Sequence, residues 1–176
     1  MKKALAIITF LLIVTSTFSQ SDKKDKEIVK DSKDAKAQFL KQDPSMASFF
    51  SKAHGYVIFP NVGKGGLGIG GASGNGSVYQ GGKLIGMARM TQVTIGLQAG
   101  GQGYREVVFF EKAENLQRFK ENDLEFTAQV SAVAATAGAS ANAKYTDGVA
   151  VFTMAKGGLM YEASVGGQKF KYEALK

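Results

Sequence analysis

The chain has 176 residues, with 22 Lys and Arg against 15 Asp and Glu, and it carries a formal net charge of +7. It contains no cysteine, which excludes disulfides and the lipid-modified type of signal peptide, so its stability must come from an ordinary core. With one histidine, His54, and no tryptophan, the chain has few residues for metal binding or histidine-dependent catalysis.

Residues 1–19 have the three parts of a signal peptide. Two lysines precede an apolar run at residues 4–14, and small polar residues follow. The run is shorter than the about 20 residues that span a bilayer, so we expect cleavage before Gln20 rather than an uncleaved anchor. Cleavage would leave 157 residues with 20 basic and 15 acidic side chains, which is enough chain for one exported domain.

Residues 22–42 are expected to form an amphipathic helix. Ile28, Ala35 and Phe39 share one side of the helical wheel, with Val29 and Leu40 at its edge. The charges are sorted, because lysines occupy one flank and carboxylates the next. The lysines of that flank are Lys23, Lys26, Lys30, Lys33 and Lys41.

Two shorter helices are expected further along the chain. Asp43-Pro44 combines an N-cap with a proline at the first helical position, and it predicts a helix that Gly55 ends. Residues 113–120 form the second, because Leu116 and Phe119 are spaced to share one side.

From Tyr56 onward the apolar pattern has a period of two, which predicts strands. The expected strands are 56–59, 67–72, 77–80, 83–91, 93–98, 105–111, 126–134, 148–155, 158–164 and 169–173. Asn75-Gly76 and Gly81-Gly82 are expected turns. Helices followed by many short strands predict an α+β domain with N-terminal helices on a mostly antiparallel sheet. Fifteen of the 22 glycines lie between residues 63 and 103, and repeated strand glycines predict a strongly curved, partly closed, barrel-like sheet.

No residue pattern indicates an active site, a metal site or a cofactor site. The GxGxxG match at residues 66–71 is followed by a turn pattern, whereas a dinucleotide site needs a helix there. No serine lies in a GxSxG motif, and His54 has no second metal ligand of its own kind. We therefore expect a protein without catalysis, metal or cofactor.

Several spaced motifs resemble the SYLF lipid-binding domain in the form found in bacterial members. The run 53–71, AHGYVIFPNVGKGGLGIGG, resembles its opening. GLQAGGQ at 96–102, followed by VVFF at 107–110, resembles its middle, and KGGLMYEASVGG at 156–167 its C-terminal part. The resemblance covers residues 30–173 and implies one SYLF-like domain at 20–176, with a helical part at 20–54 and a sheet-rich part at 55–176.

The resemblance implies binding to membranes or phospholipids, for which the family is mainly known. Some eukaryotic members also bind actin, but this chain lacks their Trp-Ser-containing motif, and an exported protein would not meet actin. We expect an anionic phospholipid or membrane surface as the partner, in the periplasm or outside the cell, and neither nucleic acid nor actin. The alternative partner is an envelope protein, bound by a structural or interaction module.

The lysine flank of helix 22–42 is the candidate lipid contact, because basic and apolar residues adjoin there as in interfacial helices. The expected lipid-binding residues are Lys23, Lys26, Lys30, Lys33, Lys41, Lys52, Lys64, Val29 and Leu40. In the alternative interpretation, the apolar residues pack on the sheet and the lysines only solvate the outside. An outer-membrane barrel is disfavoured, because the chain ends on residues 173–176 without an aromatic residue.

Overall fold

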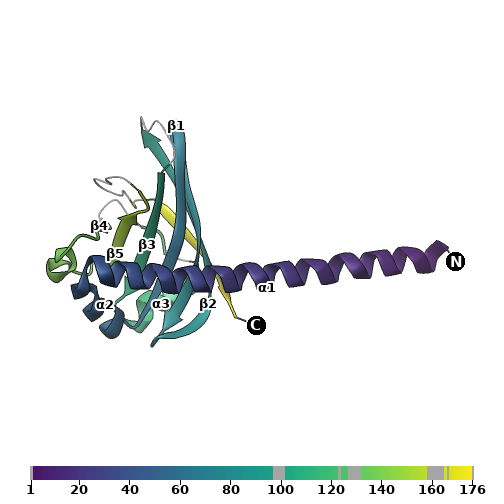
Figure 1. Ribbon diagram of the computed structural model, residues 1–176, viewed down its shortest axis with the longest axis horizontal. Helices are drawn as coiled ribbons and strands as arrows, with labels where there is room; N and C mark the ends of the chain where they lie inside the picture. Colours follow the sequence, from purple (N-terminus) through teal and green to yellow (C-terminus); the bar gives the residue numbers. More distant parts are fainter. Residues whose placement is uncertain are drawn as a thin grey trace.

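The computed structural model describes residues 2–96, 102–122, 124–126, 132–157, 165 and 167–175, with the backbone alone for residues 2–21, 66–69, 94–96 and 102. Two N-terminal helices, α1 and α2, pack on one face of a β-sheet, and the short helix α3 packs on the other (Figure 1). The predicted α+β class is confirmed.

Helix α1 (Lys2–Gln42) crosses the strands, and its N-terminal part extends away from the sheet (Figure 1). Ser32, Ala35 and Phe39 are buried against the sheet at helical spacing. The Ser32 hydroxyl also donates to the carbonyl oxygen of Ile58, at 3.4 Å. The apolar side predicted for residues 22–42 therefore packs on the sheet, as the alternative interpretation of this helix supposed.

Asp43 ties the end of α1 to a distant loop. Its carboxylate caps the 3-10 helix η1 (Pro44–Met46) by accepting hydrogen bonds from the backbone and the hydroxyl of Ser45. It also accepts from the backbone N–H of Gly138, at 3.2 Å, and of Ser140 in η2 (Ala139–Asn142), at 2.8 Å. Burial would raise the pKa of Asp43, but these hydrogen bonds outweigh it and lower the pKa to about 2. The predicted second helix is η1 followed by α2 (Ala47–Lys52).

Within the described residues, six strands form one sheet in the order β4-β5-β3-β1-β2-β6. Neighbouring strands are antiparallel except β4 and β5, which are parallel, so the sheet is mixed. The strands are β1 (Gly55–Gln80), β2 (Lys83–Gly96), β3 (Gln102–Phe110), β4 (Ala132–Ala134), β5 (Val149–Ala155) and β6 (Gln168–Ala174). The strand expected at 158–164 lies outside the described residues. So do residues 97–98 of the strand expected at 93–98 and residues 127–131 of the one expected at 126–134.

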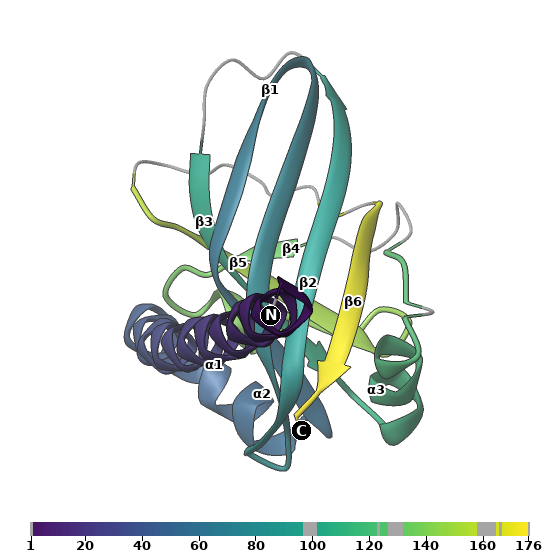
Figure 2. The same ribbon diagram turned by 90° about the vertical axis from the view of Figure 1, so that its right-hand side faces the viewer.

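Strand β1 doubles back on itself (Figure 2). Its first arm, residues 55–64, pairs with β3, and its second arm, residues 68–80, pairs with β2. The strand predicted at 56–59 continues through Pro60 instead of ending before it. Pro60 lies at an irregularity between Phe59 and Val62, where the ladder register shifts and the missing N–H of proline is tolerated.

The expected barrel-like curvature is not found, because the sheet is neither closed nor strongly curled. In the described part of the chain, β4 and β6 form opposite edges. The glycines serve close packing instead. A Cβ atom at Gly76 would lie 2.5 Å from the carbonyl oxygen of Ile58, and one at Gly74 would lie 3.0 Å from that of Asn61. Only glycine lets the two arms of β1 approach so closely.

The turn predicted at Asn75-Gly76 is wrong for the same reason. These residues lie within the second arm of β1, opposite Arg89 and Ala88 of β2. The chain turns at the other predicted position, Gly81-Gly82, where φ is +55° and +79°. Glycine adopts such positive φ values without strain.

Apolar layers cover both faces of the sheet around β1 and β3. On one face, Tyr56, Ile58 and Phe109 pack with Phe39 and Phe49 of the N-terminal helices. On the other, a second apolar layer includes Leu116 and Phe119 of α3 (Ala113–Lys120), a helix predicted with the same bounds. The alternation of buried residues along β1 and β3 follows from the opposite directions of successive side chains in a strand.

The second layer also contains buried polar side chains. Glu106 of β3 is fully buried, and its Oε2 accepts a hydrogen bond from Nε2 of Gln168 in β6, at 2.9 Å. Thr153 of β5 is the register partner of Glu106. The Glu106 Oε1, Thr153 Oγ1 and Gln168 Oε1 atoms are buried without a hydrogen-bond partner in the described structure. Burial raises the pKa of Glu106 to about 7, and the hydrogen bond from Gln168 opposes that rise.

Candidate membrane-contact surface

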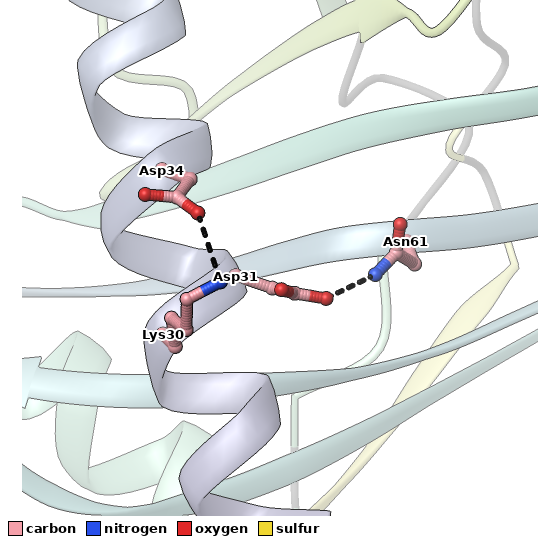
Figure 3. Close-up of polar contacts among 4 residues, drawn as sticks. All are labelled: Lys30, Asp31, Asp34 and Asn61. Atoms are coloured by element: carbon pink, nitrogen blue, oxygen red, sulfur yellow. Dashed lines mark hydrogen bonds and ion pairs between the residues drawn. The ribbon is translucent and has the colours of Figure 1, made fainter.

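The acidic side of α1 holds the helix on the sheet. Figure 3 shows Asp31 pointing toward Asn61 of β1, whose Nδ2 donates to Asp31 Oδ2 at 3.0 Å. Lys156 also donates to Asn61, from the end of β5. Asn61 lies in the first arm of β1 on the way to the bend, so the acidic side of α1 faces the bend of β1.

Lys36 marks the opposite side of the helix. Its Nζ donates to the hydroxyl of Tyr56, at 3.2 Å, and lies 4.6 Å from the ring centroid of Phe50. Partial burial lowers the pKa of Lys36. Tyr56 is further from the bend of β1 than Asn61, so this side of α1 faces away from the bend.

The predicted lysine flank lies beyond Lys36, on the outer surface of α1. Its five lysines, Lys23, Lys26, Lys30, Lys33 and Lys41, are all exposed. Lys30 Nζ lies 3.9 Å from Asp34 Oδ2, and the two side chains are 78% and 64% exposed, so this ion pair leaves the lysine accessible (Figure 3). At a rise of about 1.5 Å per residue, the flank extends over roughly 27 Å.

The other expected lipid-binding residues do not all join this flank. Val29 is half-buried beside it, and Leu40 is half-buried against the apolar layer under the helices. Lys52 is exposed at the end of α2. Lys64 lies on the first arm of β1 opposite Gln102, on the bend side of α1, and is therefore separated from the lysine flank.

Sequence reasoning missed a second basic group, on the bend side of α1. A cleft of about 260 Å³ lies between α1 and the sheet, and Lys24, Arg89 and Lys171 contribute to its lining together with Asp25 and Glu173. Lys171 Nζ lies 3.2 Å from Glu173 Oε1, so the basic residues exceed the acidic ones by one. Arg89 of β2 and Lys171 of β6 are direct register partners. Alternation along β2 and β6 could have placed Arg89 and Lys171 on the outer face of the sheet. Their proximity could not be predicted, because the pairing of β2 with β6 joins distant parts of the sequence.

The described residues also bear on other kinds of site. Among them, no three His, Cys, Asp or Glu side chains come together as a possible metal site. None of the described helices is long and apolar enough to cross a membrane. His54 is half-buried, and its Nε2 lies 3.0 Å from Nε2 of Gln80.

Comparison with known proteins identifies the family. Residues 91–174 match the family model Ysc84, described as Las17-binding protein actin regulator. Beta cell expansion factor A of Aeromonas veronii is 30% identical over 135 residues, which is 76% of this chain and 51% of that protein. The chain thus spans about half the length of this relative. The chain belongs to the Ysc84 family of SYLF-domain proteins.

Proposed function

We propose that this protein is an exported, non-catalytic lipid-binding domain that docks on anionic membrane surfaces through the lysine flank of α1. One observation carries the proposal: five exposed lysines line the outer side of a helix whose inner side is fixed on the sheet. A fixed helix presents its charges together, so an anionic surface can meet several lysines at once. Family membership supports lipid as the partner class.

The expected strength of docking follows from the charges. Each lysine near an anionic membrane contributes about 1 kcal/mol at ordinary ionic strength, and salt screens this attraction within about a Debye length. Replacing three lysines of the flank by glutamate removes about 3 kcal/mol of attraction and adds repulsion, so the partition coefficient should fall by at least about 100-fold.

Flotation of the full chain with vesicles of phosphatidylcholine and phosphatidylglycerol tests the proposal. The wild-type protein should float at low salt, and the variant carrying Lys26→Glu, Lys30→Glu and Lys33→Glu should not. The matched control carries Lys83→Glu, Arg118→Glu and Lys144→Glu, which change the net charge equally at exposed positions outside the flank. The control should retain most of its binding.

Three outcomes would count against the proposal in different ways. If wild-type protein does not float at low salt, lipid docking is wrong, and a co-purifying envelope protein would then favour an interaction module. If the flank variant floats as well as the wild type, the lysine flank is not the docking surface. If both triple variants lose binding equally, total charge rather than this surface controls association.

A further inference from the structure

The two arms of β1 form a hairpin whose bend, with the adjoining end of β2, extends past the helices (Figure 2). We call this part of the sheet the hairpin end. The first arm of β1 continues beyond Asn61, which α1 contacts, and the second arm returns from the bend at residues 65–69. At about 3.3 Å per residue, the bend lies roughly 20 Å beyond Asn61. The hairpin end therefore stands clear of the surface that α1 covers.

The hairpin end carries no charge. Residues 65–82 and residues 90–104 contain no Asp, Glu, Lys or Arg. Five strands, β1, β2, β3, β5 and β6, run toward this end. In or next to each of them, the charged residue nearest to the hairpin end is basic. These residues are Lys64 on β1, Arg89 on β2, Arg105 on β3, Lys156 just past β5 and Lys169 on β6. An uncharged end is thus followed by five basic residues, which we call the basic collar. One of them, Lys169, lies 3.6 Å from the carboxylate of Glu125, and both side chains stay exposed.

A large apolar side chain is exposed at this end. Val93 is 73% exposed. Among the described residues, the other exposed large apolar side chain is Leu175, which is 49% exposed. Gly71 lies opposite Val93, and Ile69 lies opposite Ile95 in the β1–β2 register. Residues two apart in a strand belong to the same face, so Val93 shares a face of β2 with Thr91 and Arg89.

We propose that this hairpin end enters the interfacial region of an anionic bilayer, with Val93 among the inserted residues and the basic collar at the level of the headgroups. Thr91 is opposite Lys169, so the collar begins about 7 Å below Val93 on this face. Interfacial elements bury their apolar residues about 5–10 Å into the boundary between headgroups and acyl chains. A carboxylate at the end would oppose insertion, and the strands of this end have none.

This insertion contact is separate from the lysine flank. The hairpin lies on the side of α1 that Asp31 faces, whereas the flank lies on the outer surface of α1, away from the sheet. The two contacts also differ in chemistry, since screening by salt weakens the flank while apolar insertion persists. The inference rests on the proposed function only in that both need the protein to meet a membrane.

A single tryptophan tests the inference, because the chain has none of its own. Val93→Trp places the probe at the hairpin end. The matched control is Leu175→Trp, which replaces the other exposed apolar residue, 49% exposed just after β6. Full-chain variants are mixed with phosphatidylcholine–phosphatidylglycerol vesicles, with and without bromine on the acyl chains. The tryptophan at 93 should shift its emission to the blue and be quenched by bromine, and that at 175 should do neither.

The outcomes separate this inference from the proposed function. Vesicle flotation with an unshifted, unquenched tryptophan at 93 would overturn insertion and leave lipid docking standing. Absence of flotation would overturn both. A blue shift without vesicles that grows with protein concentration would identify a second copy of the chain as the occupant and would also overturn insertion.

A substitution gives the same test without a probe. Val93→Asp should weaken vesicle partitioning at least about tenfold at high salt, where apolar burial dominates the remaining binding. Leu175→Asp adds the same charge and should change partitioning less than about twofold. Circular dichroism of both variants checks that they fold. Equal partitioning of the two variants at high salt would refute the insertion of Val93.

Discussion

Replacing the buried Glu106 by glutamine should make the protein more stable at neutral and alkaline pH. The side chain is fully buried in the apolar layer between the sheet and α3, and one carboxylate oxygen has no partner in the described structure. When such a carboxyl ionises, its charge lacks the water that would solvate it, and the protein does not replace that water with hydrogen bonds. Glu106→Gln keeps the size of the group and can preserve the contact with Gln168, but it cannot ionise.

The magnitude follows from the pKa of Glu106, which is raised from 4.5 to about 7 in the folded protein. A group with a raised folded pKa contributes its full stability below the unfolded pKa and loses it as pH rises through the folded pKa. The difference between the folded and unfolded pKa values corresponds to about 3 kcal/mol of stability, at about 1.4 kcal/mol for each pKa unit. Wild-type stability should therefore fall between about pH 4.5 and pH 7 by this amount.

Urea unfolding followed by far-ultraviolet circular dichroism at pH 5 and pH 8 measures the effect. Glu106→Gln should match the wild type at pH 5 and exceed it by up to about 3 kcal/mol at pH 8. The control Glu27→Gln removes an exposed carboxylate of α1 and should follow the wild-type profile. If Glu106→Gln retains the wild-type pH dependence, the buried carboxyl does not control it, and the electrostatic reasoning is wrong.

Three further predictions concern the fold and export. Asp43→Ala should destabilise the protein by about 2 kcal/mol at pH 7, measured by urea unfolding, because four hydrogen bonds to a buried carboxylate are lost. Its folded pKa of about 2 lies below the ordinary 3.8, so the difference from wild type should shrink as pH falls through 3.8 toward 2. Gly76→Ala should lower stability by about 2 kcal/mol or more, because its Cβ would meet the Ile58 carbonyl, whereas Gly63→Ala has open space. Equal stability of the two alanine variants would contradict close packing of the β1 arms. Finally, mass spectrometry of protein from the cell envelope or medium should find Gln20 as the N-terminal residue, and an intact Met1 in exported protein would refute cleavage.

The parts of the fold that local patterns control could be predicted from the sequence. Helix α3 has the predicted bounds, and the buried side of α1 contains Ala35 and Phe39 as the helical wheel required. The bounds of β1 could not be predicted, because its arms are held together by contacts between residues far apart in the sequence. Asn75-Gly76 has the local pattern of a turn, yet the packing of Gly76 on Ile58 decides its conformation.

The candidate surfaces were predictable to different degrees. The lysine flank follows from helical spacing alone, and its lysines are exposed as the pattern implied. The group formed by Lys24, Arg89 and Lys171 depends on the pairing of β2 with β6 and on where α1 crosses the sheet, which no local pattern contains. Glu106 could have been noticed, because alternation puts it on the same face of its strand as Val108 and Phe110.

Strand β6 pairs with β2, and 76 positions separate the partners Gln92 and Gln168. The neighbouring hairpin of β1 and β2 can form from adjacent sequence, whereas the last strand must close a long loop, so it should join late in folding. Until then, the outer edge of β2 is an open template for strands from other chains, a known route to aggregation. A chain that emerges from its N-terminus would expose this edge until β6 follows, so β6 protects the whole sheet against such pairing.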